Sequence, residues 1–318
     1  MLVLEGIESL ERIETGEPSA TLVGVFDGVH LGHQRLLHEL QELASRHRAL
    51  ATVVTFQNHP DEFLRGTPVD WIVSLQHRLR LLRRAGVDRV LSLRFDERIR
   101  EMTAERFCRE ILCSGLQTKA LLLGYDSAIG KNREGTPARL RELGQSLDFE
   151  VEEGSRFTVD GEPVSSTAIR RAILAGDLVS AHRMLGRWPS ALGTVQRGDG
   201  RGRGLGFPTA NLLLDRFVLP PAGVYAIEAL LGGEEHFGVA HLGPRPSFDR
   251  ASTPPAQTPE PTRLEVHLFE QSDRDLYDER LEVFFRAWVR APATFDDLQS
   301  LKVQIQRDAE SARRLLSS

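Results

Sequence analysis

The sequence contains very little cysteine: only Cys108 and Cys113 in a chain of 318 residues. The two lie five positions apart in one apparently helical stretch, a spacing that fits neither a disulfide framework nor a metal site. We therefore expect two ordinary thiols in buried or half-buried positions. A disulfide-stabilised domain is excluded as a class.

Long apolar runs are also missing, and none approaches the roughly 20 residues that a membrane-spanning helix requires. The chain begins MLVLEGIESLERIETGE, with glutamate where a signal peptide would carry lysine or arginine. Together these absences predict a soluble protein that stays in the cytoplasm and has no membrane partner.

An excess of positive charge is absent as well. The 40 Lys and Arg residues are outnumbered by 45 Asp and Glu residues, which gives a formal net charge of -5. Such a chain lacks the broad positive field that gives proteins non-specific affinity for nucleic acids. We expect no nucleic-acid partner, and any bound phosphate must be held by a local group of residues.

The length itself predicts two domains, because 318 residues exceed what one hydrophobic core usually supports. In the first half, short apolar runs alternate with amphipathic helical patterns, which is typical of a parallel sheet covered by helices. Strands are expected at 21–26, the first of the chain, and at 51–56, 89–95, 120–124 and 149–157. Helices are expected at 32–48, 75–85, 103–112 and 137–147, from Ser166 to the Gly176-Asp177 stop, and in a short segment ending near Gly186. This pattern predicts an α/β Rossmann-like domain over residues 1–186.

The second half, residues 187–318, has a different pattern. Six apolar runs separated by glycine and proline follow one another: LGTVQRG, NLLLD, GVYAIEALL, FGVAHLG, RLEVHLF and LEVFFRAWV. Helical periodicity returns only at about Phe295. We predict a small antiparallel β-barrel closed by a C-terminal helix.

The segment VGVFDGVHLGHQRLL (23–37) is the first candidate site. A strand delivers His30 and His33 into the turn that opens a helix, and the N-terminus of a helix attracts phosphate. In a doubly wound sheet this is also the edge where ligands bind. Two solvent-exposed histidines in a turn are the alternative interpretation, but their placement between strand and helix favours a phosphate site.

The segment VSSTAIRRAILAGD (164–177) is the second candidate, because two hydroxyls and an arginine meet at the start of a helix. Ser166, Thr167 and Arg170 there provide groups that a polyphosphate needs. The alternative is that Ser166 is a simple helix cap.

Together these motifs are more specific than either one alone. GVFDGVHLGH followed by SSTAIR resembles the adenylyltransferase module of bacterial bifunctional FAD synthetases, which belong to the HxGH nucleotidyltransferase superfamily. GRGLGFPTANL (202–212) resembles the riboflavin kinase signature, and GVYAI, LGPRPSF and LEVHLFE follow in that family's order. The chain is therefore identified as a member of the bacterial riboflavin kinase/FMN adenylyltransferase family.

The resemblance implies two ATP-dependent reactions: phosphorylation of riboflavin to FMN by the C-terminal domain, and adenylylation of FMN to FAD by the N-terminal domain. It implies riboflavin, FMN and ATP as substrates, with Mg²⁺ accompanying ATP. Glu265 would be the general base of the kinase, while His30 and His33 would stabilise the transition state of the adenylyl transfer. Thr209 and Asn211 would hold the metal. The ATP- and phosphate-binding residues that the resemblance implies are Gly24, Phe26, Asp27, Gly28, Gly32, Ser166, Thr167, Arg170, Gly202, Arg203, Gly206, Pro208, Thr209 and Asn211.

Three segments depart from the family pattern. GYDSAIG (124–130) replaces GxDFRFG, so an arginine and two aromatic rings are lost at positions 127–129. FQNHP stands in place of FEPHP, and His241 stands where the kinase often has asparagine. Asn58, Asp126 and Arg133 are the residues that we still expect to contact flavin or nucleotide.

Three other functions remain open. The nearest is a riboflavin kinase whose N-terminal domain is a weakened relic, which would form FMN but no FAD. A flavin or nucleotide sensor would bind without turnover, but it would have no need of a base such as Glu265. Another HxGH transferase would leave the second domain unexplained.

Overall fold

The computed structural model describes residues 1–13, 17–125, 127–197, 206–214, 217–243, 263–270 and 276–317. The chain divides into two compact units, described here one at a time. The first unit comprises Met1–Val69 and Leu75–Ser166, and the second comprises Asp70–Ser74 and Thr167–Ser318. Among the described residues, no helix is long and apolar enough to cross a membrane.

The first unit is built on a six-stranded parallel sheet with the strand order β1-β4-β3-β2-β5-β6. The strands are β1 (Leu2–Glu5), β2 (Ser19–Val23), β3 (Leu50–Phe56), β4 (Arg89–Leu93), β5 (Thr118–Leu123) and β6 (Glu150–Glu153). From β2 the chain builds outward through β3 and β4, and then crosses to the other side of β2 to form β5. The carboxyl ends of β2 and β5 therefore flank the topological switch point, where sheets of this kind bind their ligands.

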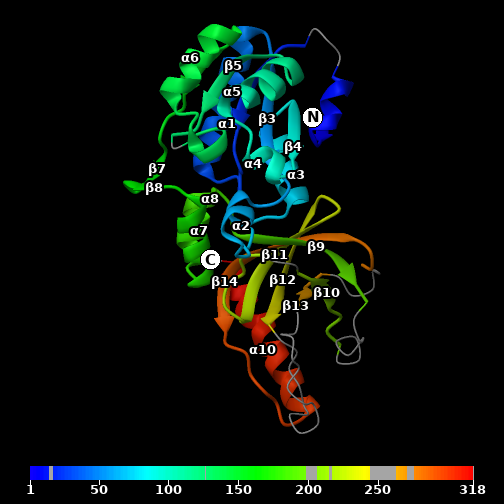
Figure 1. Ribbon diagram of the computed structural model, residues 1–318. Coiled ribbons are helices and arrows are strands. Elements are labelled where there is room, and N and C mark those ends of the chain that lie inside the picture. Colours follow the sequence, from blue (N-terminus) through cyan, green and yellow to red (C-terminus); the bar gives the residue numbers. More distant parts are fainter. Residues whose placement is uncertain are drawn as a thin grey trace. The chain divides into compact units, whose positions relative to one another are not determined.

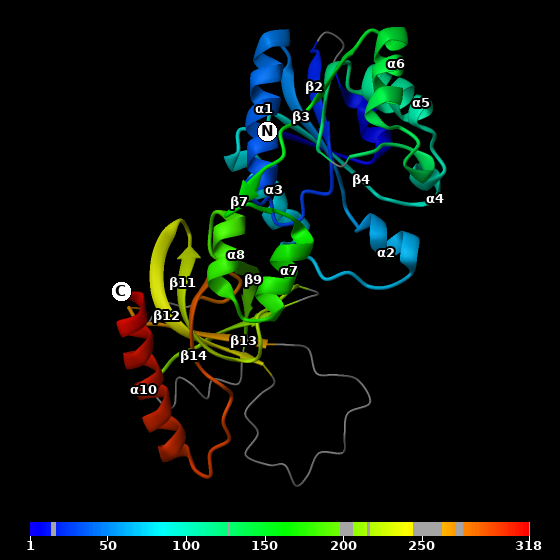
Figure 2. The same ribbon diagram turned by 90° about the vertical axis from the view of Figure 1, so that its left-hand side faces the viewer.

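Helices cover both faces of this sheet. Figure 2 shows α1 and α3 on one face, and α5 and α6 on the other. Leucines of α1 and α3 share one apolar cluster, while residues of α5 and α6 belong to a second. The helical segments of this unit are η1 (Ile7–Arg12), α1 (Leu31–His47), α2 (Pro60–Arg65), α3 (Leu75–Arg84), α4 (Glu97–Arg100), α5 (Ala104–Phe107), η2 (Cys108–Gly115), η3 (Lys131–Arg133) and α6 (Pro137–Leu147).

The predicted α/β architecture of the first unit is confirmed, with local differences such as the strand expected over 149–157, which ends at Glu153. The strand expected over 21–26 ends at Val23, and β1 precedes it, so the prediction that it comes first is wrong. The helix expected over 103–112 changes at Cys108 into a π-helix. Cys108 is buried and Cys113 half-buried, both as free thiols, and burial raises the pKa of Cys108 to about 12.

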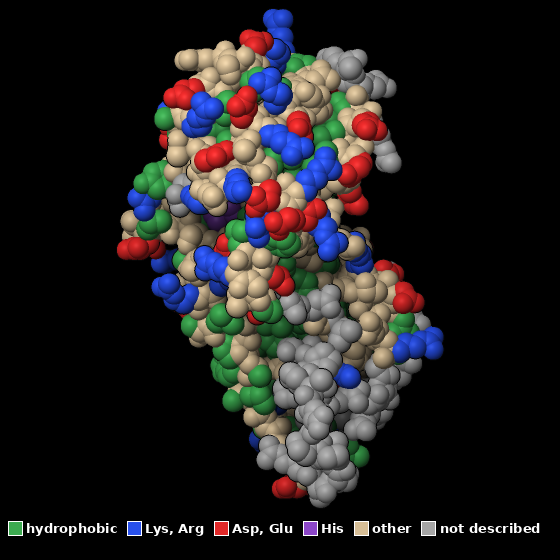
Figure 3. All heavy atoms as spheres, in the orientation of Figure 1, with side chains coloured by type: hydrophobic (Ala, Val, Ile, Leu, Met, Phe, Trp, Pro, Cys, Tyr) green, Lys and Arg blue, Asp and Glu red, His purple; other side chains and the backbone are tan. Residues whose placement is uncertain are grey.

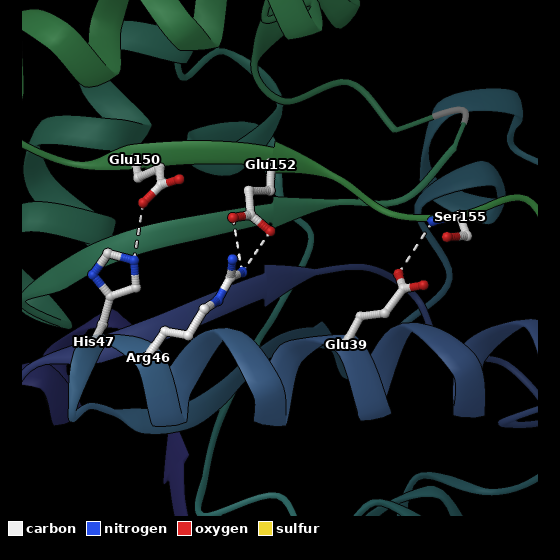
Figure 4. Close-up of polar contacts among 6 residues, drawn as sticks. All are labelled: Glu39, Arg46, His47, Glu150, Glu152 and Ser155. Carbon is white, nitrogen blue, oxygen red and sulfur yellow. Dashed lines mark hydrogen bonds and ion pairs between the residues drawn. The ribbon is translucent and has the colours of Figure 1, made fainter.

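Polar contacts fasten α1 to β6 and to the segment that follows it (Figure 4). The Arg46 guanidinium donates to both carboxylate oxygens of Glu152, at 2.7 and 2.8 Å. At the middle of the helix, a Glu39 carboxylate oxygen accepts from the backbone N–H of Ser155 at 3.1 Å. These contacts hold the C-terminal half of α1 against β6 and the segment that follows it.

The second unit contains a closed antiparallel barrel with the strand order β10-β13-β12-β11-β14-β9, as predicted (Figure 1). Its strands are β9 (Ser190–Gln196), β10 (Ala210–Leu213), β11 (Gly223–Leu231), β12 (Glu234–Gly243), β13 (Arg263–Leu268) and β14 (Arg280–Arg290). Inward-facing apolar side chains of all six strands fill the barrel. The helices α7 (Ser166–Leu174) and α8 (Leu178–Leu185) precede it, and the small hairpin of β7 (Thr158–Val159) and β8 (Glu162–Pro163) closes the first unit.

The C-terminal helix α10 (Leu298–Leu316) packs against the outer surface of β11, β12 and β14. Ala312 of this helix joins Val224 and Ala226 of β11 in a small apolar cluster. Beside it, the Arg290 guanidinium donates to both carboxylate oxygens of Asp308, and Asp308 is only 4% exposed. Elsewhere acidic and basic side chains are intermixed over the face shown in Figure 3.

Replacing Asp308 with alanine is expected to destabilise the second unit by about 3 to 5 kcal/mol, because the substitution leaves a largely buried guanidinium without its partner. The measurement is chemical denaturation of the full chain. Glu310→Ala, which removes an exposed carboxylate from the same helix, is the matched control and should leave the midpoint unchanged. Equal midpoints of unfolding for the two variants would show that the ion pair between Arg290 and Asp308 does not stabilise the second unit.

Candidate active sites

The turn between β2 and α1 has an unusual backbone conformation. Phe26 and Val29 have positive φ values of 54° and 40°, in the region that favours glycine, and Gly28 has a φ of 82°. Non-glycine residues adopt this conformation only where the surrounding structure enforces it, which is common at functional sites. The motif VGVFDGVHLGH therefore forms a turn that its surroundings must hold in place.

Four side chains hold this turn through its carbonyl oxygens. The Val25 carbonyl accepts from the Thr55 hydroxyl at 3.0 Å and from the Arg78 guanidinium at 2.7 Å. The Val29 carbonyl accepts from the Gln34 amide at 3.0 Å. The Asp27 carbonyl accepts from the Ser166 hydroxyl at 2.9 Å. Ser166 therefore joins the two motifs, although they lie 139 residues apart.

The two histidines stack on one another at the start of α1. Their ring centroids lie 3.6 Å apart, and His30 Nδ1 accepts from the backbone N–H of His33. Because Nδ1 of His30 is an acceptor, a neutral His30 carries its proton on Nε2, as a donor to phosphate requires. Gly32 permits this packing, since a Cβ there would lie 3.2 Å from the His30 ring.

His33 is held in its neutral form. Burial lowers its pKa well below the ordinary value, and the charges of His30 and Arg78 lower it further. Within the described part of the chain, His33 Nδ1 is buried and has no hydrogen-bond partner. A buried imidazole nitrogen without a partner has already lost its hydrogen bonds to water, so it can bond to a ligand at little extra cost of desolvation.

Binding of ATP is expected to raise the pKa of His33, because the negative phosphates favour the protonated imidazolium. In the free protein, His33 should titrate below its ordinary value of about 6.5, and in the complex it should titrate at a higher pH. Two-dimensional NMR of protein labelled with ¹⁵N-histidine measures both values, and His33→Asn assigns the signal. An unchanged pKa on saturation with ATP would show that the phosphates lie elsewhere.

A pocket of about 1100 Å³ opens at the carboxyl ends of β2, β3 and β5. Its wall is apolar on one part, with Phe56, Phe95 and Phe107, and carries cations on another. The cationic side chains are those of Arg65, Arg100, Lys131 and Arg133, and Glu101 of the same wall pairs with two of them, Arg100 and Lys131. Gly24 lines the same pocket, so the pocket borders the histidine turn. An apolar cavity with a few cations suits a flat, phosphorylated aromatic molecule.

The residues that replace the family's Phe-Arg-Phe also line this pocket. Ser127, Ala128 and Ile129 are small or aliphatic, so cation contacts must come from other residues of the wall. Arg133, expected from the sequence to touch the ligand, lines the pocket, whereas Asp126 lies outside the described residues. The Asn58 amide both donates to and accepts from the backbone of Phe95, at 2.9 and 2.8 Å. Asn58 thus fixes one aromatic wall, and its expected contact with a ligand stays a prediction.

Thr167 and Arg170, the other residues of the second motif, belong to the second unit. The Thr167 side chain is exposed, and Arg170 Nε donates to the carbonyl of Asp70 at 3.1 Å. Their expected contact with the phosphates of ATP stays a prediction.

The candidate kinase site lies on the outer face of the barrel. Leu264, Val266 and Leu268 of β13 point into the core, so Glu265 points outward. In the strand register, Asn211 of β10 lies directly opposite Glu265 on one side, and His241 of β12 lies opposite it on the other. Side chains paired in this way share one face and have Cβ atoms about 5 Å apart. Burial lowers the pKa of His241, an effect that the nearby Glu265 partly offsets.

His267 is a residue of this site that sequence reasoning missed. It follows Glu265 by two positions on the same face of β13, and its Nδ1 lies 3.0 Å from the carbonyl oxygen of Pro208. The Phe207 ring packs edge-on against the same imidazole. His267 thereby docks the segment that carries Thr209 and Asn211 next to Glu265. Gly206, with a φ of 85°, begins that segment, whereas Gly202 and Arg203 lie outside the described residues.

The donor atoms on this face suit Mg²⁺ that arrives with ATP. The described residues contain no group of three or more His, Cys, Asp or Glu side chains that could hold a metal by themselves. Thr209 and Asn211 provide a hydroxyl and an amide oxygen, and Mg²⁺ bound to nucleotides takes most of its ligands from phosphate and water. A site with few protein ligands therefore fits this metal.

The two halves of the chain match two families of known proteins. The family described as FAD synthetase matches residues 12–168, and the family described as riboflavin kinase matches residues 185–316. These ranges contain both histidines of the first motif and Glu265 of the barrel, respectively.

Relatives named for both activities match along the whole chain. A bifunctional riboflavin kinase/FMN adenylyltransferase from Haemophilus influenzae is 35% identical and covers 100% of both chains. The enzyme of the same name from Escherichia coli K12 is 36% identical over 98% of this chain and 97% of its own. A crystal structure described as a macrolide-efflux protein from Streptococcus pneumoniae is 29% identical, with a TM-score of 0.82 over 98% of this chain and 99% of that one.

Proposed function

The chain belongs to the bifunctional riboflavin kinase/FMN adenylyltransferase family, and on that premise we propose that it converts riboflavin to FMN and FMN to FAD, with ATP as co-substrate of both reactions. We assign the adenylyl transfer to residues 1–186 and the kinase reaction to residues 187–318. Riboflavin, FMN and ATP are the substrates in this proposal, and the cytoplasm is where the enzyme works.

In the kinase reaction, Glu265 accepts the proton of the riboflavin 5′-hydroxyl as that oxygen attacks the γ-phosphorus of ATP, and ADP leaves. Asn211 lies opposite Glu265 in the sheet, which supports a common site for base and nucleotide. Thr209 and Asn211 would hold Mg²⁺ there. When bound, the ion would neutralise phosphate charge. His267 contacts the carbonyl oxygen of Pro208 and so keeps the segment that carries Thr209 and Asn211 docked beside Glu265.

In the adenylyl transfer, a phosphate oxygen of FMN attacks the α-phosphorus of ATP, and pyrophosphate leaves. His30 and His33 donate hydrogen bonds to the phosphate as negative charge develops on it, which lowers the barrier. No side chain of the protein acts as the nucleophile. Ser166, Thr167 and Arg170 bind the departing pyrophosphate, and the pocket next to Gly24 takes the flavin.

The observation that carries this proposal is that one chain contains both constellations. The stacked histidines lie at the switch point of the parallel sheet, and Glu265 lies beside Asn211 on the barrel. A kinase alone would not need a stacked histidine pair at the switch point, and an adenylyltransferase alone would not need the barrel.

The test is an assay of the purified chain with riboflavin, ATP and magnesium, followed by chromatographic separation of the flavins. A second assay starts from FMN. Formation of both FMN and FAD supports the two activities. FMN without FAD, even from supplied FMN, would leave only the kinase and would make the N-terminal domain a weakened relic. Folded protein that makes neither product would overturn the assignment.

A further inference from the structure

Arg78 of α3 is completely buried in the first unit, with an exposed fraction of 0%. Its two terminal nitrogens donate to two backbone carbonyls, Val25 at 2.7 Å and Phe56 at 2.6 Å. Val25 follows β2, and Phe56 is the last residue of β3. One guanidinium therefore links the carboxyl ends of two neighbouring strands, at the edge that carries the histidine turn.

This arginine is charged and costly to bury. Burial lowers its pKa to about 10, and the carboxylate of Asp27 partly offsets that shift, so the group stays protonated at pH 7. Asp27 itself is only 1% exposed. An apolar side chain of similar volume often stabilises a protein core better than a buried charge does. Stability alone therefore gives no reason for arginine at this position.

The position of Arg78 suggests another reason. Val25 and Phe56 both line the pocket, so the guanidinium lies directly behind the pocket wall. It holds the carbonyl oxygens of both residues and so fixes this part of the wall. It also fixes the residue that precedes Phe26, where the strained part of the turn begins. A planar guanidinium, with several donors in a fixed geometry, bonds both carbonyls at once in one defined arrangement.

We propose that Arg78 is a positioning residue for the adenylyl transfer: its guanidinium fixes the Val25–Val29 turn, and with it the two histidines, against the phosphates of ATP. The inference rests on the proposed function of the first unit. Arg78 need not touch the substrates, because it acts through the backbone that it holds.

The experiment compares Arg78→Lys with Arg89→Lys in the full-length chain. Arg89 is an equally buried arginine of the same sheet, 1% exposed, but it lies at the amino end of β4 and pairs with Glu17 at 2.9 Å. Lysine keeps the charge at both positions and cannot bond two carbonyls in the same geometry. We expect Arg78→Lys to lower kcat for FAD formation about 10- to 100-fold, with KM for ATP and FMN changed less than about threefold, because small displacements of reacting groups cost rates of this size.

Arg89→Lys should leave kcat unchanged at a similar loss of thermal stability. Adding guanidinium ion to Arg78→Ala should restore part of the lost rate, as expected if the missing group is the guanidinium itself. An Arg78→Lys enzyme with the wild-type kcat would overturn the proposal. An equal loss of kcat in the two lysine variants would also overturn it, because the effect would then be one of general stability.

Hydrogen exchange gives a readout that does not depend on activity. In Arg78→Lys, the backbone amides of residues 24–30 should exchange several-fold faster than in the wild type, and in Arg89→Lys they should not. If the wild type makes no FAD from FMN, the proposed function fails while exchange still reports whether Arg78 holds the turn. Unchanged exchange in Arg78→Lys would overturn the positioning role even in an active enzyme.

Discussion

Replacing Glu265 with glutamine is expected to slow the formation of FMN from riboflavin by about 10²- to 10⁴-fold, which is the usual contribution of a general base. Glutamine keeps the size and the hydrogen-bonding reach of the side chain but cannot accept the hydroxyl proton. The loss should appear in kcat, since the outward face of β13 and its neighbours Asn211 and His241 stay in place. Rates are measured by chromatography of flavins at saturating riboflavin and ATP.

Two controls accompany this variant. FAD formation from supplied FMN should remain at the wild-type rate, because the substitution lies in the second unit. Glu235→Gln changes an exposed glutamate of β12 on the same barrel and should retain both activities. A Glu265→Gln enzyme that still makes FMN at the wild-type rate would remove Glu265 from the mechanism. Loss of both activities in a folded variant would contradict separate sites.

Replacing His33 with alanine should have the opposite effect on the two reactions. FAD formation from FMN should fall by about 10²- to 10³-fold, the range typical for removing one donor to a transition state. The substitution also removes the stacking partner of His30, whose ring lies 3.6 Å away, so the orientation of His30 will loosen. FMN formation from riboflavin should be unchanged. Both rates are obtained from the same chromatographic assay.

The matched control for this prediction is His38→Ala. His38 follows His33 by five residues in α1, its side chain is 59% exposed, and it pairs only weakly with Glu42 at 3.4 Å. It should retain both activities. Equal losses in His33→Ala and His38→Ala would mean that helix α1, rather than the histidine pair, limits the reaction.

Sequence periodicity predicted most of the fold because burial and hydrogen bonding determine it locally. The helix expected over 137–147 begins and ends where α6 does, since Thr136 caps it and Asp148 takes a left-handed conformation at its end. The six apolar runs of the second half all became strands of one closed barrel. The strand β1 escaped prediction because its four residues are too few to show a period.

The candidate sites were only partly predictable. The motifs identified His30, His33, Ser166 and Glu265, but not the contacts between them, because the bond from Ser166 to Asp27 depends on tertiary structure. Arg78 lies in LQHRLRLLRR among four arginines, and nothing in the sequence distinguishes the buried one from its neighbours. The alternation of apolar and polar residues in RLEVHLF is enough to predict that His267 shares a face with Glu265, yet only the folded chain shows that its Nδ1 lies 3.0 Å from the carbonyl oxygen of Pro208.

The short segment Asp70–Ser74 has a consequence for synthesis on the ribosome. Although it lies early in the chain, it belongs to the second unit, where the Val218 N–H donates to the Trp71 carbonyl at 2.8 Å. Some 147 residues separate these two partners in the sequence. At a translation rate of about 5 to 20 residues per second, the segment waits roughly 7 to 30 seconds for its partner to be made. The parallel sheet can form during that interval, but the hydrogen bond between Val218 and Trp71 cannot form until Val218 has been made.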